Sequence, residues 1–207
     1  MEFADRADAG RKLASRLAQF GGPDTLVLGL PRGGVPVAYE VAVALRAPLD
    51  VFLVRKLGVP HHEELAMGAI ASGGIRVVNQ TVIDELGIQQ DVVNSVAAHE
   101  QVELERREQL YRAKRPPLEV HHKLVIVIDD GLATGSSVRA AVAALRQREP
   151  RSIIVAVPVA APTTCASLRQ EVEAIVCVIM PDPFVGVGAW YADFSQTTDD
   201  EVRALLR

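Results

Sequence analysis

Two adjacent carboxylates followed by a hydroxyl-rich turn are the part of this sequence with the clearest chemical meaning. The segment VIVIDDGLATGSS spans residues 125–137, and in it four apolar residues precede Asp129 and Asp130. The apolar run is typical of a buried strand, and the residues from Ser136 onward are typical of a helix start. Free backbone N–H groups at a helix start bind anions, and glycines let the backbone approach a phosphate closely. We therefore expect a phosphate group in the turn.

The two acids are best explained as acceptors for sugar hydroxyls, because carboxylates would repel a phosphate placed directly on them. A 5-phosphoribosyl group carries vicinal hydroxyls at one end and a phosphate at the other. Asp129 and Asp130 would accept from the hydroxyls, while Thr134, Ser136 and Ser137 add donors for the phosphate. The segment lacks the lysine of a nucleotide P-loop and the G-x-G-x-x-G of a dinucleotide site. The alternative is an ordinary strand–turn–helix with exposed acids.

The segment resembles the 13-residue signature of type I phosphoribosyltransferases: four hydrophobic residues, two acids, Gly, then Ala-Thr-Gly and a closing Ser or Thr. Every position matches. The resemblance implies binding of phosphoribosyl pyrophosphate (PRPP) with Mg²⁺, the metal being held mainly by PRPP and water, near the acid pair. It also implies PRPP contacts from the residues that follow the acids, namely Gly131, Ala133, Thr134, Gly135, Ser136 and Ser137.

A second loop, within LGLPRGGVPVA (residues 28–38), resembles the pyrophosphate loop of the same family. Pro31, Arg32, Gly33 and Gly34 follow an apolar strand and precede a helix, so they also present backbone N–H groups to an anion. Arg32 can pair with that anion. A plain tight turn is the alternative.

Arg55 and Lys56 end the second apolar strand. Adenine-type members of the family place an Arg-Lys pair there, ahead of a mobile catalytic loop, which implies contact with pyrophosphate rather than a merely solvated strand end. We expect residues 57–66 to form a polar loop that serves as a lid. His61 and His62 lack the spacing of metal ligands, so we expect a solvated loop, with a lid role as the alternative.

The aromatic-rich segment 181–194, PDPFVGVGAWYADF, is the candidate hood that would hold an acceptor base. With a one-residue gap it resembles the base-binding segment of hypoxanthine-type enzymes. The resemblance implies base contacts from Phe184, Val185, Trp190 and Asp193. A core or dimer-contact role is the alternative for the aromatic residues.

Two departures disfavour a 6-oxopurine acceptor. Hypoxanthine-type members carry an acid where this chain has Ala133, and they carry a base-reading lysine where this chain has none after Lys123. We therefore expect transfer of 5-phosphoribosyl from PRPP to a nitrogenous base that the sequence does not identify. The catalytic residues would be Arg32, Lys56, Asp129 and Asp130.

Two other functions remain open. A non-catalytic PRPP-binding sensor could use the same fold, and a pyrophosphokinase that makes PRPP is a third possibility. The whole chain also resembles a bacterial subgroup of stand-alone phosphoribosyltransferases that have no assigned acceptor.

The elements needed to position these residues alternate along the chain as an α/β fold does. Apolar strands are expected at 25–30, 49–56, 123–129, 152–159 and 173–180, and a hairpin around 72–74. Helices are expected at 5–20, 34–45, 91–112, 136–148 and after Thr198. Continuous apolar strands predict a mainly parallel sheet with helices on both faces. Such sheets bind ligands at the carboxyl ends of their strands, which here are Leu30, Lys56 and Asp129.

Composition supports one globular α/β domain over residues 1–207. The chain is 49% hydrophobic with a net charge of −4, which disfavours disorder and charge-driven nucleic-acid binding. We see no signal peptide or membrane span and expect a cytoplasmic homodimer, with helix 91–112 solvated or at a subunit contact. Cys165 and Cys177 lack ligand-like spacing, and Cys177 is expected to be a buried thiol.

Overall fold

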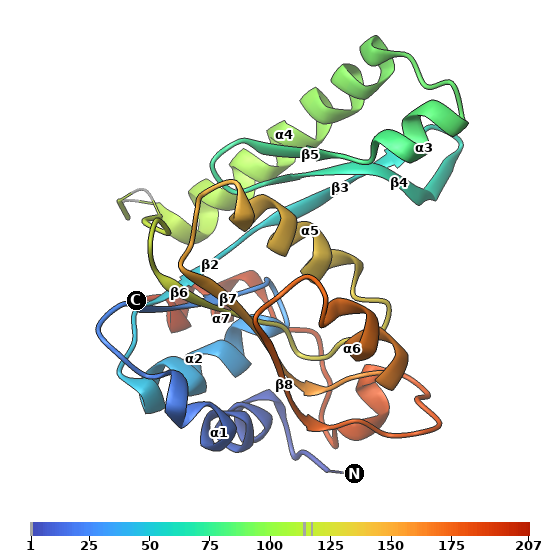
Figure 1. Cartoon of the computed structure of the whole chain (residues 1–207). Coiled ribbons are helices and arrows are strands. Elements are labelled where there is room, and N and C mark those ends of the chain that lie inside the picture. Colours follow the sequence, from blue (N-terminus) through green and yellow to red (C-terminus); the bar gives the residue numbers. More distant parts are fainter. Residues whose placement is uncertain (1, 114, 117) are drawn as a thin grey trace.

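The computed structural model describes residues 2–113, 115–116 and 118–207 (Figure 1). Its centre is a five-stranded sheet with the order β2-β1-β6-β7-β8, in which every neighbouring pair is parallel. The strands are β1 (Thr25–Gly29), β2 (Leu49–Val51), β6 (Leu124–Ile128), β7 (Ser152–Val159) and β8 (Ala174–Ile179).

Helices cover both faces of this sheet. Alternate side chains of β6 and β7 point to opposite faces, so Ile126 and Ile154 pack with α1 (Arg6–Leu17) and α2 (Gly34–Leu45). Val125 and Ile153 pack on the other face with α5 (Ser136–Arg146) and α6 (Pro162–Leu168). The prediction of a parallel sheet covered on both sides is confirmed, because strands this apolar are stable only when neither face meets water.

A second, antiparallel sheet projects away from the first, as Figure 1 shows. It has the order β3-β4-β5 and is followed by two helices that pack beside it. We call residues 54–112 the arm. Its elements are β3 (Val54–Val59), β4 (His62–Ala71), β5 (Ile75–Val78), α3 (Gln80–Glu85) and α4 (Gln90–Arg112). The expected hairpin around 72–74 is confirmed.

Two local expectations in this region were wrong. The single strand expected at 49–56 is divided, because the chain leaves the parallel sheet after Val51 and enters the arm at Val54. Residues 57–66 are not a loop: they form the end of β3, a turn at Pro60–His61 and the start of β4. The polar side chains suggested a loop, but cross-strand backbone hydrogen bonds hold the segment extended.

The C-terminal part packs beside the N-terminus. Residues 181–198 are mostly irregular, apart from a 3₁₀ turn η2 (Val187–Trp190), and α7 (Asp199–Leu205) follows. Thr198 and Glu201 form the capping box that the sequence predicted for this helix. Phe3 pairs with Tyr191 through a parallel bridge, and a 3₁₀ turn η1 (Ala18–Phe20) extends α1. Within the described ranges, no helix is long and apolar enough to cross a membrane.

Candidate functional site

The two motif loops meet at the carboxyl edge of the parallel sheet. Asp129 and Asp130 follow β6, and the loop containing Gly33 and Gly34 follows the neighbouring strand β1. A Cβ on Gly34 would lie 2.6 Å from the Ile128 carbonyl oxygen, and one on Gly33 would collide with Asp130 Oδ2. Glycine at both positions therefore allows the loop to pack directly against the acid pair.

Burial makes the acid pair electrostatically unusual. Asp129 Oδ1 accepts a hydrogen bond of 2.9 Å from the backbone N–H of Asp130. Burial, together with the neighbouring Asp130 charge, raises the pKa of Asp129 to about 8. Burial also raises the pKa of Asp130, while Arg6 opposes that shift. The unliganded pair therefore binds a proton more readily than two exposed aspartates would.

Arg6, at the start of α1, holds Asp130 in place. Its Nε and Nη2 atoms both lie 2.9 Å from Asp130 Oδ2, and its side chain is only 11% exposed. Nη1 donates to the Ser195 carbonyl at 2.6 Å, and the guanidinium lies 4.0 Å from the centre of the Phe194 ring. Sequence reasoning missed this residue, because Arg6 lies 124 positions from its partner and no local pattern marks it.

The turn after the acids is open to a ligand. Gly135, the residue before α5, has φ 74°, a conformation that favours glycine. Thr134 and Ser137 are exposed, and the hydroxyls of Thr134 and Ser136 lie 3.1 Å apart. The first N–H groups of α5 point out of this turn with no partner within the helix. Anion binding at this turn stays a prediction, which these free N–H groups and hydroxyls allow.

Arg32 belongs to the candidate pyrophosphate loop, and its side chain contacts the C-terminal helix. Its Nη1 lies 3.8 Å from Asp199 Oδ1 at the start of α7. The Tyr111 hydroxyl of α4 donates to that same oxygen at 2.5 Å. Burial and this contact raise the pKa of Tyr111 to about 12, so the phenol stays protonated as a donor. The Arg32–Asp199 contact is long for an ion pair, and the Arg32 side chain is 32% exposed.

Arg55 and Lys56 are consecutive residues of β3 and differ in their surroundings. Arg55 Nη2 lies 2.5 Å from Glu100 Oε2 on α4, so its charge is already paired. Lys56 is exposed. Both side chains line a pocket of about 770 Å³ that also reaches Ser137 of the phosphate turn. The structure thus brings the Arg-Lys pair and the phosphate turn to one cavity.

The candidate hood lies next to the acid pair. The Tyr191 hydroxyl donates to the Asp130 carbonyl at 2.6 Å, and a Cβ on Gly131 would overlap the Val187 side chain. Phe184 and Trp190 pack in a cluster around Phe3. Tyr191 and Val187, which the sequence did not single out, therefore bring the segment 181–194 against Asp130 and Gly131.

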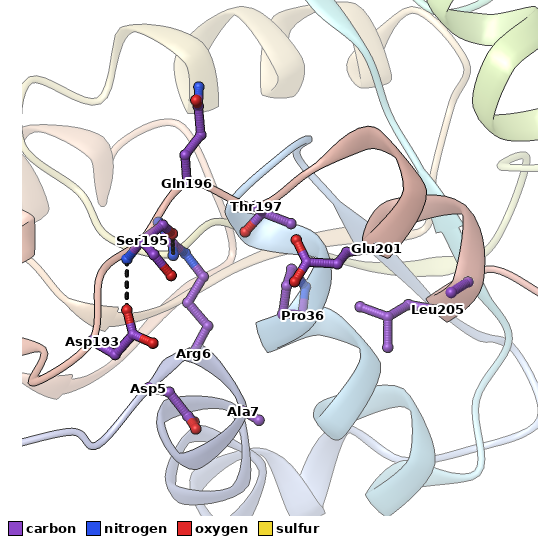
Figure 2. Close-up of a pocket in the computed structure, with 11 residues that line it drawn as sticks. Asp5, Arg6, Ala7, Pro36, Asp193, Ser195, Gln196, Thr197, Glu201 and Leu205 are labelled. Carbon is purple, nitrogen blue, oxygen red and sulfur yellow. Dashed lines mark hydrogen bonds between the residues drawn. The ribbon is translucent and has the colours of Figure 1, made fainter.

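The other two candidate base contacts are more open. Val185 is 73% exposed, and the Asp193 carboxylate accepts from the Ser195 backbone N–H, which lowers the pKa of Asp193. Asp193 also lines a pocket of about 350 Å³, and Arg6, which binds Asp130, lines the same pocket. Figure 2 shows Arg6 in this pocket, between the segment from Asp193 to Thr197 and the helix residue Pro36.

Histidines do not form a metal site in the described part of the chain. His61 lies in the β3–β4 turn and His62 begins β4, while the side chains of Glu63 and Glu64 fall outside the described residues. No group of three His, Cys, Asp or Glu side chains among the described residues could hold a metal ion.

Comparison with known proteins identifies the class to which this fold and site belong. The family model described as phosphoribosyl transferase domain matches residues 60–188. The chain belongs to the phosphoribosyl transferase family, as its fold and its two motif loops indicated.

Relatives from two bacterial species are similar over nearly the whole of this chain. The crystal structure of TT1426 from Thermus thermophilus is 42% identical with a TM-score of 0.90, covering 100% of this chain and 98% of that one. Proteins of two Mycobacterium tuberculosis strains, named provisionally as phosphoribosyl transferases, are 44% identical over 204 residues. That match covers 99% of this chain but 46% of theirs, so the chain spans about half the length of these curated relatives.

Proposed function

We propose that this protein transfers the 5-phosphoribosyl group of PRPP to a nitrogenous base and releases pyrophosphate. The observation that carries the proposal is the direct packing of the Gly33-Gly34 loop against Asp129 and Asp130, with the phosphate turn following in sequence. One edge of the sheet thereby offers carboxylates flanked by two loops that would each bind an anion. PRPP has the same order of groups: a 5-phosphate, ribose hydroxyls and a diphosphate.

In this proposal the acid pair orients the ribose. Arg6 holds Oδ2 of Asp130, which leaves Oδ1 to accept from a ribose hydroxyl. Asp129 offers a second oxygen on the same edge. Both carboxyl groups would face a sugar that gains positive charge as its bond to pyrophosphate breaks. The 5-phosphate would lie in the turn formed by residues 134–137.

Stabilisation of the departing pyrophosphate would come from the other loop and from the arm. Gly33 and Gly34 lie at the start of α2, so their backbone N–H groups can bind the diphosphate. Arg32 can leave its 3.8 Å contact with Asp199 and pair with the diphosphate. Lys56 would approach across the cavity that it shares with Ser137. These groups act on charge that grows in the transition state, so they would accelerate the reaction rather than only hold PRPP.

Magnesium fits this site as a companion of PRPP rather than as a metal held by the protein alone. One oxygen of Asp130 is already bound to Arg6, and Asp129 is the single other carboxylate of the motif. A metal near this pair would therefore take its other ligands from PRPP and water. When bound, it would neutralise charge on the diphosphate leaving group.

The hairpin 57–66 is the proposed lid over this cavity. Gly58, Val59 and Pro60 line the same pocket as Lys56, so a bend of this hairpin toward the phosphate turn would cover the ligand. A closed lid would keep water from the reacting ribose.

The acceptor is proposed to be other than a 6-oxopurine. Ala133 provides no carboxylate beside Thr134, and no lysine follows Lys123 that could read a 6-oxo group. Phe184, Val185, Trp190 and Asp193 remain the proposed base contacts. A screen of free bases with PRPP and Mg²⁺, read as pyrophosphate release, identifies the acceptor. We expect little or no release with hypoxanthine or guanine.

Calorimetry with Mg²⁺ and PRPP tests the binding part of the proposal. Asp129→Asn with Asp130→Asn should weaken PRPP affinity, because each lost charge-assisted hydrogen bond costs roughly 1.5–3 kcal/mol, or about ten- to a hundredfold in affinity. The matched control, Asp84→Asn with Asp91→Asn, removes the same charge from exposed positions of the arm and should leave affinity unchanged. Equal affinity in both double variants would refute the site. Tight PRPP binding without turnover of any base would favour a PRPP sensor.

A further inference from the structure

The two cysteines, which are 12 positions apart in sequence, lie side by side in the fold. Cys165 of α6 and Cys177 of β8 have their Sγ atoms 3.4 Å apart, and both are free thiols. A disulfide bond is about 2.05 Å long, so the two sulfurs need to approach by roughly 1.4 Å to form one. A shift of that size is within reach of a short helix packed on a strand at the edge of the sheet.

The thiol pair is reachable from solvent through a small pocket. This pocket, of about 260 Å³, is lined by both cysteines and by Arg16, Arg169 and Met180. Cys165 itself is buried, whereas Cys177 is partly exposed. A molecule of two or three heavy atoms can enter such a space, while a protein partner cannot. The guanidinium of Arg169 also favours the thiolate form of Cys165, whose pKa is lowered chiefly by its hydrogen bond with Cys177.

We propose that Cys165 and Cys177 form an oxidative modification site for small hydroperoxides. One thiolate attacks the O–O bond of the peroxide, becomes a sulfenic acid and releases water or an alcohol. The second thiol then attacks that sulfenic sulfur and releases a molecule of water, which leaves a disulfide. The two sulfurs together lose two electrons, and the peroxide takes them up with the protons.

The dithiol is connected to the phosphate turn through its neighbour Thr164. The Thr164 hydroxyl donates to the Ala133 carbonyl at 2.5 Å, and a Cβ on Gly135 would lie 2.9 Å from the Thr164 methyl group. Leu132 also pairs with Ala160, just before α6. A disulfide that draws α6 toward β8 therefore displaces Thr164 from the turn. Oxidation should loosen the turn.

Chemical counting of thiols tests the site directly. Folded protein is treated with a slight excess of hydrogen peroxide, quenched with catalase, denatured and alkylated with iodoacetamide. We expect the wild type to lose both free thiols, to become lighter by two hydrogen atoms, to remain monomeric on a non-reducing gel and to recover both thiols with dithiothreitol. Cys165→Ser and Cys177→Ser should each form no intrachain disulfide. The proposal would be overturned if both thiols stayed unreacted, if sulfinic acids were the main product, or if disulfides formed only between chains.

Alanine variants guard against a folding defect. If Cys165→Ser does not fold, as judged by circular dichroism, Cys165→Ala replaces it, because alanine adds no polar group to the buried position. Cys177→Ser, at the partly exposed position, is the second variant.

Hydrogen exchange tests the coupling to the phosphate turn. We expect the backbone amides of residues 131–137 to exchange at least about threefold faster in the oxidised wild type than in the reduced one. Thr164→Val keeps the shape of the side chain but lacks the hydroxyl. In this variant, oxidation should change the exchange rates of residues 131–137 less than it does in the wild type. Equal rates in reduced and oxidised wild type would overturn the coupling.

The consequence for ligand binding rests on the proposed function. Oxidised protein should bind PRPP with Mg²⁺ about threefold more weakly than reduced protein, because Thr164 no longer fixes the turn. Unchanged affinity would overturn this consequence. Reduced protein that binds no PRPP would instead refute the proposed function, while the thiol count would still decide the modification site.

Discussion

Arg6 and Asp130 form a two-nitrogen salt bridge that joins the first helix to the end of a central strand. Nε and Nη2 both lie 2.9 Å from Asp130 Oδ2, and the two side chains are only 11% and 17% exposed. The same guanidinium binds the Ser195 carbonyl. One residue therefore links the N-terminal helix, the acid pair and the C-terminal segment.

Removal of Arg6 should destabilise the protein and disorder the acid pair. Arg6→Ala leaves Asp130 unpaired in a partly buried place, which costs about 3–5 kcal/mol of unfolding free energy. Arg6→Lys keeps the charge but loses the two-nitrogen geometry, so an intermediate loss is expected. Urea unfolding at neutral pH measures the unfolding free energy of both Arg6 variants. Arg11→Ala, on the same helix but 58% exposed, should lose no more than about 1 kcal/mol. Equal stability of the two alanine variants would contradict the role of Arg6.

Stability should fall as pH rises, because of Asp129. Its pKa is raised in the folded state to about 8, from 3.8. Between these values the folded state holds a proton that the unfolded state has lost, so folding is favoured at the acidic end of the range. The loss is at most about 1.4 kcal/mol per pH unit. Asp129→Asn removes this titration and keeps the acceptor for the Asp130 N–H.

Unfolding free energies at pH 5 and pH 8 check this expectation. At pH 8 the unfolding free energy of Asp129→Asn, relative to that of the wild type, should be higher than it is at pH 5. The same difference at both pH values would show that Asp129 ionises normally.

Gly33→Ala should disturb the acid pair through a steric effect alone. The backbone at Gly33 has φ −63° and ψ −31°, which alanine adopts without strain, but its Cβ would collide with Asp130 Oδ2. Asp130 must then move away from Arg6. We expect PRPP affinity to fall at least about tenfold, with a smaller loss of stability, as read by calorimetry and urea unfolding. Gly22→Ala is the control, because its Cβ would meet only Thr25 Oγ1 at 3.8 Å. Wild-type affinity in Gly33→Ala would count against the packing of the two loops.

Arg32 and Lys56 should matter more for turnover than for binding. Arg32→Ala or Lys56→Ala should lower kcat/KM with the true acceptor by more than it weakens direct PRPP binding, because both cations are proposed to stabilise charge on the departing pyrophosphate. The measurement compares kinetics and calorimetry on the same variants. Equal losses in kcat/KM and in PRPP affinity would indicate that these cations bind the ground state and the transition state equally well. Arg46→Ala, which removes a cation at the far end of α2, serves as the control.

Ligand should protect the hairpin 57–66 from proteolysis. A protease of broad specificity should cut first near the Pro60–His61 turn, and PRPP with Mg²⁺ should slow that cut if the hairpin closes as a lid. The β4–β5 turn at Gly73-Gly74 provides an internal comparison on the same arm. Identical cutting at the first turn with and without ligand would remove the lid from the proposal.

The continuous apolar runs were sufficient to predict the parallel sheet, but Lys56, which was expected at the carboxyl end of one of its strands, lies in antiparallel β3. Strand burial and turn chemistry are local properties, so β7 and α2 begin and end where the sequence pattern placed them. The same local view failed at 57–66, because the backbone hydrogen bonds between β3 and β4 depend on a partner strand rather than on the polar side chains of the segment.

The sequence by itself determined which residues are candidates for binding a phosphoribosyl group, since Asp129, Asp130 and the glycines that follow form one short motif. Only the tertiary structure decided which groups set the charge and orientation of that motif. Arg6 reaches Asp130 across 124 positions, and Tyr191 reaches its carbonyl across 61. The physical reason is that burial and ion pairing depend on which side chains the fold packs together, and no local sequence pattern records that packing.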